Sequence, residues 1–521
     1  MNRVLSLLML AVLAGTSATA RAADAPNAKA PPPAAPSMPT EPGAFPDSVT
    51  SHSLAIDGKT IAYTARAGLI TLHDQEGKVT AQVFYTADTA DGVAPSTRPV
   101  TFIYNGGPGS STMWLRMGSF GPVRVIAADG TPSGPAPYRI VDNQYSLLDK
   151  SDLVFIDMPD SGFGRITPGL EKSFFGVDQD VAAFGQFITN YLSKFDRWNS
   201  PKFIFGESYG TPRSAALSAY LFDHGVTLNG VILQSSILNF GLDYGNGDPI
   251  GGGDWAYVFY LPTEAATAWY HNKIPNRPAD LPSFLATVKQ FAMGEYLDAL
   301  YKGDKLGESE RDDVIRKLSY FTGVSPQYVR LSNIRIPYDK FENELLRNQG
   351  DTVGRLDSRY QTWNLDRASL EGPPWDPTDS SIDGPYTTAI NLYLRRDLQY
   401  NPPIPYRTQI YDIIFGADFS NPDGWDMSHN HRYPTNTAPD LADTMAQNPS
   451  MKVFSANGYY DFATPTFATD YTLRHLNLNP TLQSNITYGY YQAGHMIYLS
   501  EPALSQYKAD LARWYDNALG H

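Results

Sequence analysis

The sequence predicts an α/β fold in which a mainly parallel central sheet is interrupted by a large, mostly helical insertion. Between about residues 100 and 240, short apolar runs typical of buried strands alternate with amphipathic helical segments. A long region rich in Gly, Pro, Tyr and Trp, without clear buried strands, follows up to about residue 445. Strand-like runs then return in MKVFSANGYYD and ITYGYYQAGHM.

The N-terminus has the composition of an export signal followed by a tether. Arg3 precedes an apolar run over residues 4–13, and Ala20-Arg21-Ala22 provides a small-residue cleavage site. The apolar run is too short to cross a bilayer. Residues 23–48 are rich in Ala and Pro without apolar periodicity, which predicts a disordered segment. We therefore expect a cleaved signal peptide over residues 1–22 and a periplasmic or secreted bacterial protein.

Composition excludes several classes of function. The chain has no cysteine, which rules out disulfides, thiol catalysis and Cys-based metal sites. Its formal net charge is −14, and loss of residues 1–22 removes two arginines and no acid, giving −16. Lys and Arg do not cluster, so we expect no binding to nucleic acid or to a membrane. His429 and His431 have no placed third ligand, and no motif requires a metal or another cofactor.

The remaining elements predict a core in two parts, residues 49–240 and 446–521, around a cap over residues 241–445. HSLAIDGKTIAYTARAGLITL alternates around an Asp-Gly turn, which is typical of a β-hairpin. The runs KVTAQVFYTA, PVTFIYNGG, SDLVFIDMP, KFIF and NGVILQSSIL follow as strands. A helix is predicted between the third and fourth runs. Its apolar face carries Val181, Phe184, Phe187, Ile188, Tyr191 and Leu192.

The stretch KFIFGESYGTPRSAAL contains the first chemically informative motif. Gly206-Glu207-Ser208-Tyr209-Gly210 fits a nucleophile elbow, in which a serine lies on a strained turn from a strand into a helix. A short apolar strand precedes the motif, and a helix that begins with small residues follows it. This context predicts that Ser208 is an activated nucleophile.

A nucleophilic serine needs a base, an acid that orients the base, and donors for an oxyanion. On this kind of sheet the order along the chain is Ser, acid, His. Asp461 in VFSANGYYDFATP and His495 in YQAGHMIYLSEP both follow predicted strands, whose carboxyl ends are where sites assemble. YNGGPGSS follows an earlier strand, and its glycines can direct backbone N–H groups at an oxyanion.

Together these motifs resemble the serine carboxypeptidase family. The matching segments, in family order and over nearly all of the expected mature chain, are NGGPGSS at 105–111, IDMPDSGFG at 156–164, GESYG at 206–210, ANGYYDF at 456–462 and AGHMIYLSEP at 493–502. The resemblance implies an α/β-hydrolase fold with an insertion over the site. It implies a serine-type carboxypeptidase that releases C-terminal residues from peptides through an acyl-enzyme, without a cofactor. Family members often form dimers, so a homodimer is a further expectation.

The resemblance also implies roles for individual residues. Ser208 would be the nucleophile, His495 the general base and acid, and Asp461 the carboxylate that orients the histidine. The backbone amides of Gly107 and Tyr209 would form the oxyanion hole.

Substrate binding is where the sequence departs from the family. The resemblance implies substrate contacts from Asn105, Gly106 and Glu207, with Met496 lining the pocket of the leaving residue. The family's second carboxylate-binding Glu aligns with Ser119, which is therefore a further candidate for substrate binding, and no acidic residue lies between positions 105 and 128. Two neighbouring carboxyls raise each other's pKa, so that one can stay protonated and bind a substrate carboxylate. Without the second, we expect Glu207 to ionise more readily and to repel such a substrate.

Three alternatives stay open. Arg116, Arg124 or Arg213 could supply a different carboxylate anchor. An esterase or acyltransferase could use the same triad, because acyl-enzyme chemistry does not by itself select an amide over an ester. A non-catalytic binding protein is the third interpretation, against which the complete set of catalytic residue types argues.

Overall fold

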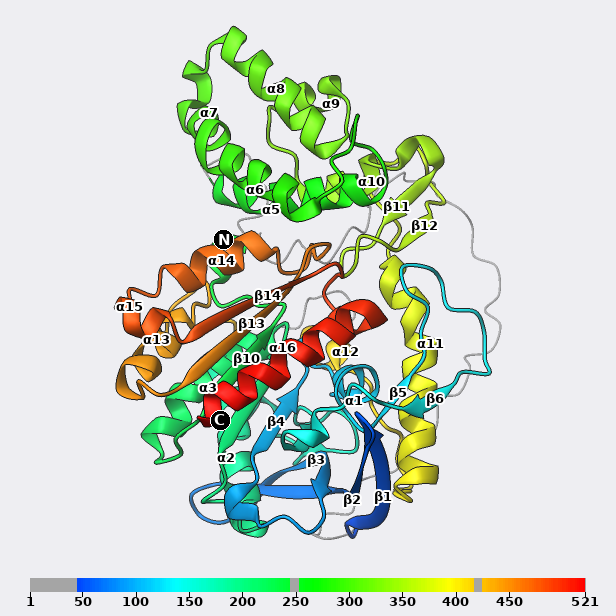
Figure 1. Cartoon of the computed structure of the whole chain (residues 1–521), viewed down its shortest axis with the longest axis vertical. Coiled ribbons are helices and arrows are strands. Elements are labelled where there is room, and N and C mark those ends of the chain that lie inside the picture. Colours follow the sequence, from blue (N-terminus) through cyan, green and yellow to red (C-terminus); the bar gives the residue numbers. More distant parts are fainter. Residues whose placement is uncertain (1–44, 244–252, 417–423, 521) are drawn as a thin grey trace, which may run out of the picture.

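The computed structural model describes residues 45–243, 253–416 and 424–520, and has a sheet-and-helix core with a helical lobe at one end (Figure 1). The predicted signal peptide, residues 1–22, and residues 23–44 of the predicted disordered segment lie outside these ranges. Strand β1 begins at Ser48, and the Asp47 carboxylate before it accepts a hydrogen bond from Lys194 Nζ at 3.0 Å. The folded part therefore begins slightly before the predicted boundary.

The core is built on one ten-stranded sheet. Its strand order is β1-β2-β3-β7-β4-β9-β10-β13-β14, with β8 paired to β3. The strands are β1 (Ser48–Ile56), β2 (Lys59–His73), β3 (Val79–Ala90), β4 (Val100–Tyr104), β7 (Asp152–Ile156), β8 (Arg165–Ile166), β9 (Lys202–Glu207), β10 (Gly230–Gln234), β13 (Lys452–Gly458) and β14 (Ile486–Tyr491). The pairs from β7 to β14 are parallel, and those from β1 to β7 are antiparallel. The predicted mainly parallel sheet is confirmed, and so is the first hairpin, which turns at Asp57-Gly58.

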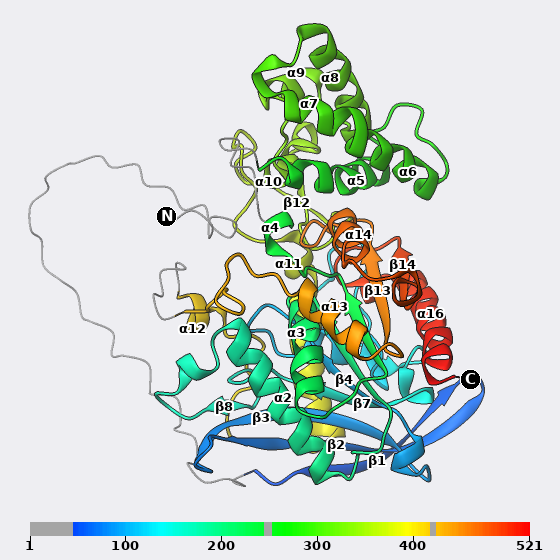
Figure 2. The ribbon, with the colours of Figure 1, turned by 90° about the vertical axis from the view of Figure 1, so that its left-hand side faces the viewer.

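Helices cover both faces of this sheet (Figure 2). The helices that share apolar clusters with its strands are α1 (Met113–Gly118), α2 (Val177–Lys194), α3 (Gly210–Asp223), α11 (Pro377–Leu392), α13 (Ala438–Gln447) and α16 (Glu501–Leu519). Ile204 of β9 packs in the apolar cluster of α2, α3 and α13, whereas Phe203 and Phe205 pack in that of α1, α11 and α16. A strand buried on both faces must be apolar throughout, which explains the uninterrupted KFIF run.

The lobe is a helical unit with its own apolar cluster. Its helices are α5 (Trp255–Tyr270), α6 (Leu281–Phe291), α7 (Leu297–Lys302), α8 (Glu308–Thr322), α9 (Pro326–Leu331) and α10 (Tyr338–Glu344). The cluster also contains Tyr460 and Phe462, which follow β13, so the lobe stands over the carboxyl end of that strand. No helix in the described ranges has the length and apolar character needed to cross a membrane.

The smaller elements connect these parts. They are β5 (Val123–Val125), β6 (Ile140–Asp142), β11 (Asp351–Val353), β12 (Gln361–Trp363), α4 (Phe240–Asp243), α12 (Tyr411–Phe415), α14 (Thr466–Arg474) and α15 (Pro480–Gln483). β5 pairs with β6 and β11 with β12, each as an antiparallel two-stranded sheet.

The insertion is more divided than the single cap predicted over residues 241–445. Tyr386 of α11 and Tyr393, directly after this helix, are buried in the core cluster that also contains α16. Ile414 of α12 and Leu441 of α13 join the cluster on the opposite face. These segments therefore complete the core after the lobe, because their apolar side chains cover sheet faces that the preceding elements leave open. The composition of the region is uniformly rich in Gly, Pro and Tyr, so it does not distinguish the segments that form the lobe from those that complete the core.

Ile204→Ala should strongly destabilise the core. Ile204 is fully buried between β4 and β10, and truncation of such a side chain costs about 2–5 kcal/mol through lost burial and the cavity left behind. Urea unfolding followed by circular dichroism measures the change. The matched variant Val49→Ala, at a position on β1 that is 52% exposed, should change stability by less than about 0.5 kcal/mol. Equal effects of the two substitutions would contradict the assignment of the core.

Candidate active site

The serine motif forms a tight turn between β9 and α3. Ser208 directly follows β9 and has a φ of +59°, a left-handed conformation that costs a residue other than glycine on the order of 1–3 kcal/mol. Gly206 makes the turn possible, because a Cβ at this position would lie 2.0 Å from the carbonyl oxygen of Gly210. Ser208 is half-buried, whereas Glu207 and Tyr209 are buried. The motif thus has the geometry of a nucleophile elbow, with its serine hydroxyl available to a ligand.

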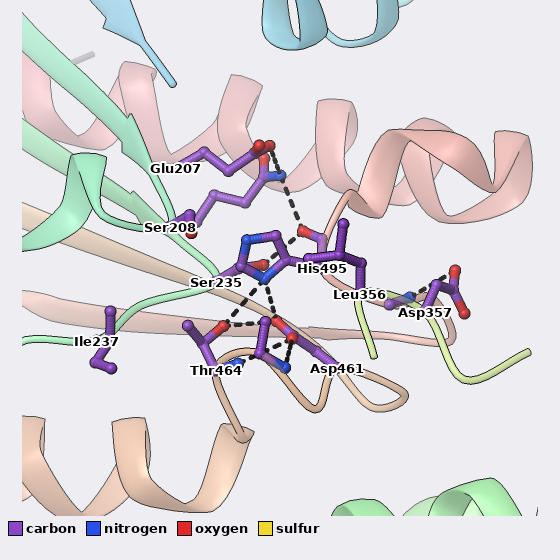
Figure 3. A network of polar contacts seen from close by, with 12 residues as sticks. Glu207, Ser208, Ser235, Ile237, Leu356, Asp357, Asp461, Thr464 and His495 are labelled. Carbon is purple, nitrogen blue, oxygen red and sulfur yellow. Dashed lines mark hydrogen bonds and ion pairs between the residues drawn. The ribbon is translucent and has the colours of Figure 1, made fainter. Parts of the chain in front are cut away.

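A buried histidine–carboxylate pair lies beside this turn (Figure 3). Nδ1 of His495 lies 2.8 Å from Oδ2 of Asp461, and the other ring nitrogen faces Ser208 (Figure 3). Asp461 follows β13 and His495 follows β14, so all three residues lie at the carboxyl ends of parallel strands. The sheet therefore brings together three side chains that are far apart in the sequence.

Asp461 is held in one orientation by its own loop. Its Oδ1 accepts the backbone N–H groups of Ala463 at 2.8 Å and Thr464 at 2.9 Å, and its Oδ2 accepts the Thr464 hydroxyl at 2.6 Å. The carboxylate is fully buried. A carboxylate placed in this way favours the tautomer of His495 that carries its proton on Nδ1, which leaves Nε2 free to accept a proton.

The electrostatic environment favours protonation of His495. Burial lowers the pKa of the imidazole, but the Asp461 carboxylate, its hydrogen bond and the charge of Glu207 together raise that pKa above 6.5. The imidazolium that forms when a serine loses its proton is thereby stabilised.

The backbone of His495 is fixed by residues from two other segments (Figure 3). Its N–H donates to the carbonyl of Leu356 at 2.6 Å, and its carbonyl accepts the hydroxyl of Ser235 at 2.6 Å. The preceding Gly494 N–H donates to Asp357 Oδ2 at 3.2 Å. Ser235 follows β10, whereas Leu356 and Asp357 belong to the insertion. The insertion therefore contributes directly to the position of the histidine.

The Gly-rich loop after β4 lies directly against the serine turn. A Cβ on Gly106 would lie 2.4 Å from the backbone nitrogen of Tyr209, so only glycine allows this approach. In the part of the chain that the structure describes, neither Gly107 N–H nor Tyr209 N–H donates to a backbone carbonyl. The family resemblance implies an oxyanion hole formed by these two donors, and the contact places their segments side by side.

Glu207 lies in a closed polar environment behind Ser208. Its Oε1 accepts Nδ2 of Asn105 at 2.6 Å and the Tyr498 hydroxyl at 3.4 Å, and its Oε2 accepts Nε2 of Gln234 at 2.6 Å. Burial raises the pKa of Glu207 to about 7. Desolvation therefore supplies a shift like the one that a neighbouring carboxylate would supply, and the expected ionisation of Glu207 falls at about pH 7.

The side chains of Ser119 and Met496 are buried, as are those of Asn105 and Glu207. The hydroxyl of Ser119 donates to the carbonyl of Leu115 at 2.6 Å within α1, and the residue is 1% exposed. A place for Ser119 in substrate binding stays a prediction. Tyr386 and Tyr498 occupy the space beside the preceding Gly118. Met496 is buried in the core cluster, and its place in a pocket for the leaving residue stays a prediction.

The three arginines suggested as anchors are engaged elsewhere. Arg116 and Arg213 are buried and paired with Asp88 and Asp180. Arg124 pairs with the exposed carboxylate of Glu501 at 2.8 Å. Buried carboxylates neutralise Arg116 and Arg213, so neither offers a free anchor, whereas for Arg124, whose partner is exposed, the suggestion stays a prediction.

Sequence reasoning missed several residues of the site. Thr464 bonds Asp461 from three positions later, a spacing typical of a turn in which a hydroxyl supports a carboxylate. Ser235 and Tyr498 give no such signal, because their contacts depend on the strand order and on the fold of the last helix. Leu356 acts through its carbonyl, which no side-chain pattern reveals.

The histidine pair SHNHR has a structural explanation for its first member. His429 lies between two carboxylates, with Nδ1 2.6 Å from Asp178 and Nε2 3.0 Å from Asp440. Within the ranges that the structure covers, no group of three or more His, Cys, Asp or Glu side chains could hold a metal ion.

Comparison with known families identifies the first half of the core. Residues 57–243 match the family model described as serine carboxypeptidase. The matched segment contains Asn105, Gly107, Glu207 and Ser208, whereas Asp461 and His495 lie beyond it and join the site through the fold.

Individual relatives agree with this match at low identity. Serine carboxypeptidase-like 45 of Arabidopsis thaliana is 27% identical over 212 residues, which are 38% of this chain and 42% of the relative. The P-(S)-hydroxymandelonitrile lyase of Sorghum bicolor is 27% identical over 150 residues, 28% of this chain and 27% of the lyase. The matches thus span less than half the length of these relatives.

Among solved structures, the proline iminopeptidase of Mycobacterium smegmatis covers 87% of this chain and 98% of its own, with a TM-score of 0.37 and 11% identity. An open-form lipase covers 87% of this chain and all of its own, with a TM-score of 0.35 and 13% identity. The strand order and the serine turn agree with the family match over residues 57–243. Over residues 57–243 the chain is similar to the serine carboxypeptidases, and its core has the strand order of the α/β-hydrolase fold.

Proposed function

We propose that this protein is a serine-type carboxypeptidase that releases C-terminal residues from peptides through an acyl-enzyme. The observation that carries the proposal is the 2.8 Å contact between His495 and Asp461 beside the serine turn. The match over residues 57–243 supports the same reaction class. No cofactor is needed for this chemistry.

In this proposal Ser208 attacks the scissile carbonyl while Nε2 of His495 accepts the hydroxyl proton. The oxyanion that forms accepts hydrogen bonds from the N–H groups of Gly107 and Tyr209. His495 then gives the proton to the leaving amine, and the amine departs. A water molecule, deprotonated by His495, attacks the acyl-enzyme and regenerates Ser208. Asp461 keeps its hydrogen bond to Nδ1 of His495 throughout and stabilises the imidazolium.

The terminal carboxylate of the substrate would be recognised beside Asn105 and Glu207. Because Glu207 has a pKa near 7, it is largely protonated in mildly acidic solution and can donate a hydrogen bond to a carboxylate. Asn105 and Tyr498 flank it and supply further polar groups. One buried carboxyl group can thus bind the substrate carboxylate, for which the family uses two.

An esterase or acyltransferase is the second candidate, and one observation favours it. Ser119, at the position of the second carboxylate-binding Glu, is buried and bonded within its own helix. Loss of that Glu weakens selection for a free carboxylate while leaving the triad intact. A non-catalytic binding protein would have no use for the oriented His495–Asp461 pair.

Peptides are the proposed partners, and a homodimer is part of the same proposal. The pattern of residues 1–22 supports export to the periplasm or the medium.

An N-blocked dipeptide with a free C-terminus should be hydrolysed faster than the same dipeptide with an amidated C-terminus at pH 5–6. The reason is that only the free carboxylate can accept the Glu207 hydrogen bond. Release of the amino acid, followed by liquid chromatography, measures both rates. Ser208→Ala should abolish turnover of either substrate. Equal rates on the two dipeptides, or turnover of esters alone, would favour the second candidate.

The Michaelis constant for the free-carboxylate dipeptide should rise as the pH increases through about 7. Glu207, whose pKa is about 7, is neutral below this pH and can donate to the substrate, and above it becomes an anion that repels the substrate. Glu207→Gln should remove this rise, because glutamine does not titrate. The amidated dipeptide serves as the control and should show no such dependence. A pH-independent Michaelis constant in the wild type would rule out recognition through Glu207.

Asp461→Asn should lower kcat by about 10⁴-fold with the fold intact. The asparagine oxygen is expected to keep the two backbone N–H groups of Ala463 and Thr464, which turns its NH₂ group towards His495. Nδ1 must then accept, so the proton moves to Nε2, where the ring can no longer take the serine proton. Steady-state kinetics test this, with the exposed Asp443→Asn as a control expected to retain full activity. A loss of less than tenfold would argue against the triad.

A further inference from the structure

Arg213 is one of the most completely buried charged residues of the molecule, and the proposed mechanism does not use it. It lies on the first turn of α3, five residues after Ser208, and is 0% exposed. Its Nε donates to Oδ2 of Asp180 at 2.6 Å and its Nη2 to Oδ1 of the same carboxylate at 3.2 Å. Asp180, in the first turn of α2, is also fully buried. A two-point pair of this kind fixes the plane of the guanidinium as well as its position.

The third guanidinium nitrogen reaches the Gly-rich loop. Nη1 of Arg213 donates to the backbone carbonyl of Asn105 at 2.8 Å. This carbonyl belongs to the peptide unit immediately before the one that carries the Gly107 N–H. The guanidinium also packs over the rings of Phe184 and Tyr104, at 4.1 Å and 5.2 Å from their centroids. Contacts with Asp180 and the two rings thus fix the guanidinium of Arg213, which in turn bonds the backbone carbonyl of Asn105.

The loop that Arg213 holds carries one of the two proposed oxyanion donors, and the helix of Arg213 begins next to the other. Gly106 lies against the backbone nitrogen of Tyr209, where a Cβ would approach to 2.4 Å. A rotation of the Asn105 carbonyl would therefore change the direction of the Gly107 N–H relative to the Tyr209 N–H. Donors contribute to catalysis only if they point to where the oxyanion forms.

We propose that Arg213, oriented by Asp180, is a positioning residue that sets the Gly107 N–H of the oxyanion hole through the carbonyl of Asn105. This inference rests on the proposed function. It differs from a general stabilising role in a measurable way. An oxyanion forms only on the way to the acyl-enzyme, so a misdirected donor lowers kcat while the Michaelis constant stays nearly unchanged.

The chain offers a matched control at the opposite end of the same strands. Arg197 is also buried, and its Nη1 donates to Asp152 Oδ2 at 2.6 Å while its Nη2 donates to the carbonyl of Arg98 at 2.9 Å. Asp152 is the first residue of β7, and Arg98 precedes β4, so this pair lies at the amino ends of the strands. It is likewise a buried Arg–Asp pair that also bonds a backbone carbonyl, but it has no connection to the Gly-rich loop.

The experiment compares Arg213→Lys with Arg197→Lys in the full-length protein. The substrates are the free-carboxylate dipeptide and p-nitrophenyl butyrate, and thermal unfolding is measured in parallel. Lysine keeps the charge but cannot reproduce the planar three-way contact. We expect kcat of Arg213→Lys to fall about 10- to 100-fold with little change in the Michaelis constant and in the pH profile. Arg197→Lys should keep kcat within about twofold, although both variants unfold at lower temperature.

A double variant keeps the test decisive if Arg213→Lys does not fold. Arg213→Met combined with Asp180→Leu replaces the whole pair by apolar side chains, an exchange that often preserves stability, while leaving the Asn105 carbonyl without its donor. A stable double variant with the same loss of kcat would support the proposal. Unchanged kcat in either folded Arg213 variant, with an active wild type, would overturn the positioning role alone. A wild type inert towards both substrates would overturn the proposed function, and the inference with it.

Discussion

The close contact between the Gly-rich loop after β4 and the serine turn after β9 constrains the rest of the site. Gly106 lies so near the backbone of Tyr209 that a single methyl group would prevent the approach. The same crowding recurs within the turn, between Gly206 and Gly210. Because β4 and β9 are neighbours in a parallel sheet, their carboxyl ends fix this contact before any side chain is placed. The remaining groups are arranged around it.

Buried ionic groups support this contact from two sides. On the α2 side, Asp180 and Arg213 hold the Gly-rich loop. On the insertion side, Asp357 bonds the Gly494 N–H while it pairs with Arg359, so the histidine loop is fixed by a segment that the core itself does not contain. Buried ion pairs add little to stability as a rule, since desolvation offsets their attraction. In this protein these ion pairs hold backbone groups in fixed orientations, and the desolvation of the charges is the free-energy cost of that arrangement.

Much of the fold and the centre of the site were predictable from the sequence. The KFIF run, the hairpin around Asp57-Gly58 and the apolar face of α2 depend on local periodicity, which the chain carries in full. Ser208 could be found because an elbow needs small residues at fixed positions. Asp461 and His495 could be found because each follows a strand in the required order.

The features that could not be predicted from the sequence depend on contacts between segments that are distant along the chain. The raised pKa of Glu207 follows from burial, and one of its hydrogen-bond partners, Tyr498, lies almost 300 positions away in the chain. Arg213 looked like a free cation until the structure paired it with Asp180. The division of the insertion at α11 follows from which sheet faces remain uncovered, and composition carries no information on that.

The central claim is that Ser208 is a nucleophile activated by His495, and covalent trapping tests it most directly. The protein would be incubated with a fluorophosphonate, digested and analysed by mass spectrometry, beside the Ser208→Ala and His495→Gln variants. The account predicts one adduct, on the peptide that contains Ser208, with labelling absent in Ser208→Ala and strongly slowed in His495→Gln. Absence of an adduct in the wild type, or equal labelling of the wild type and His495→Gln, would contradict it.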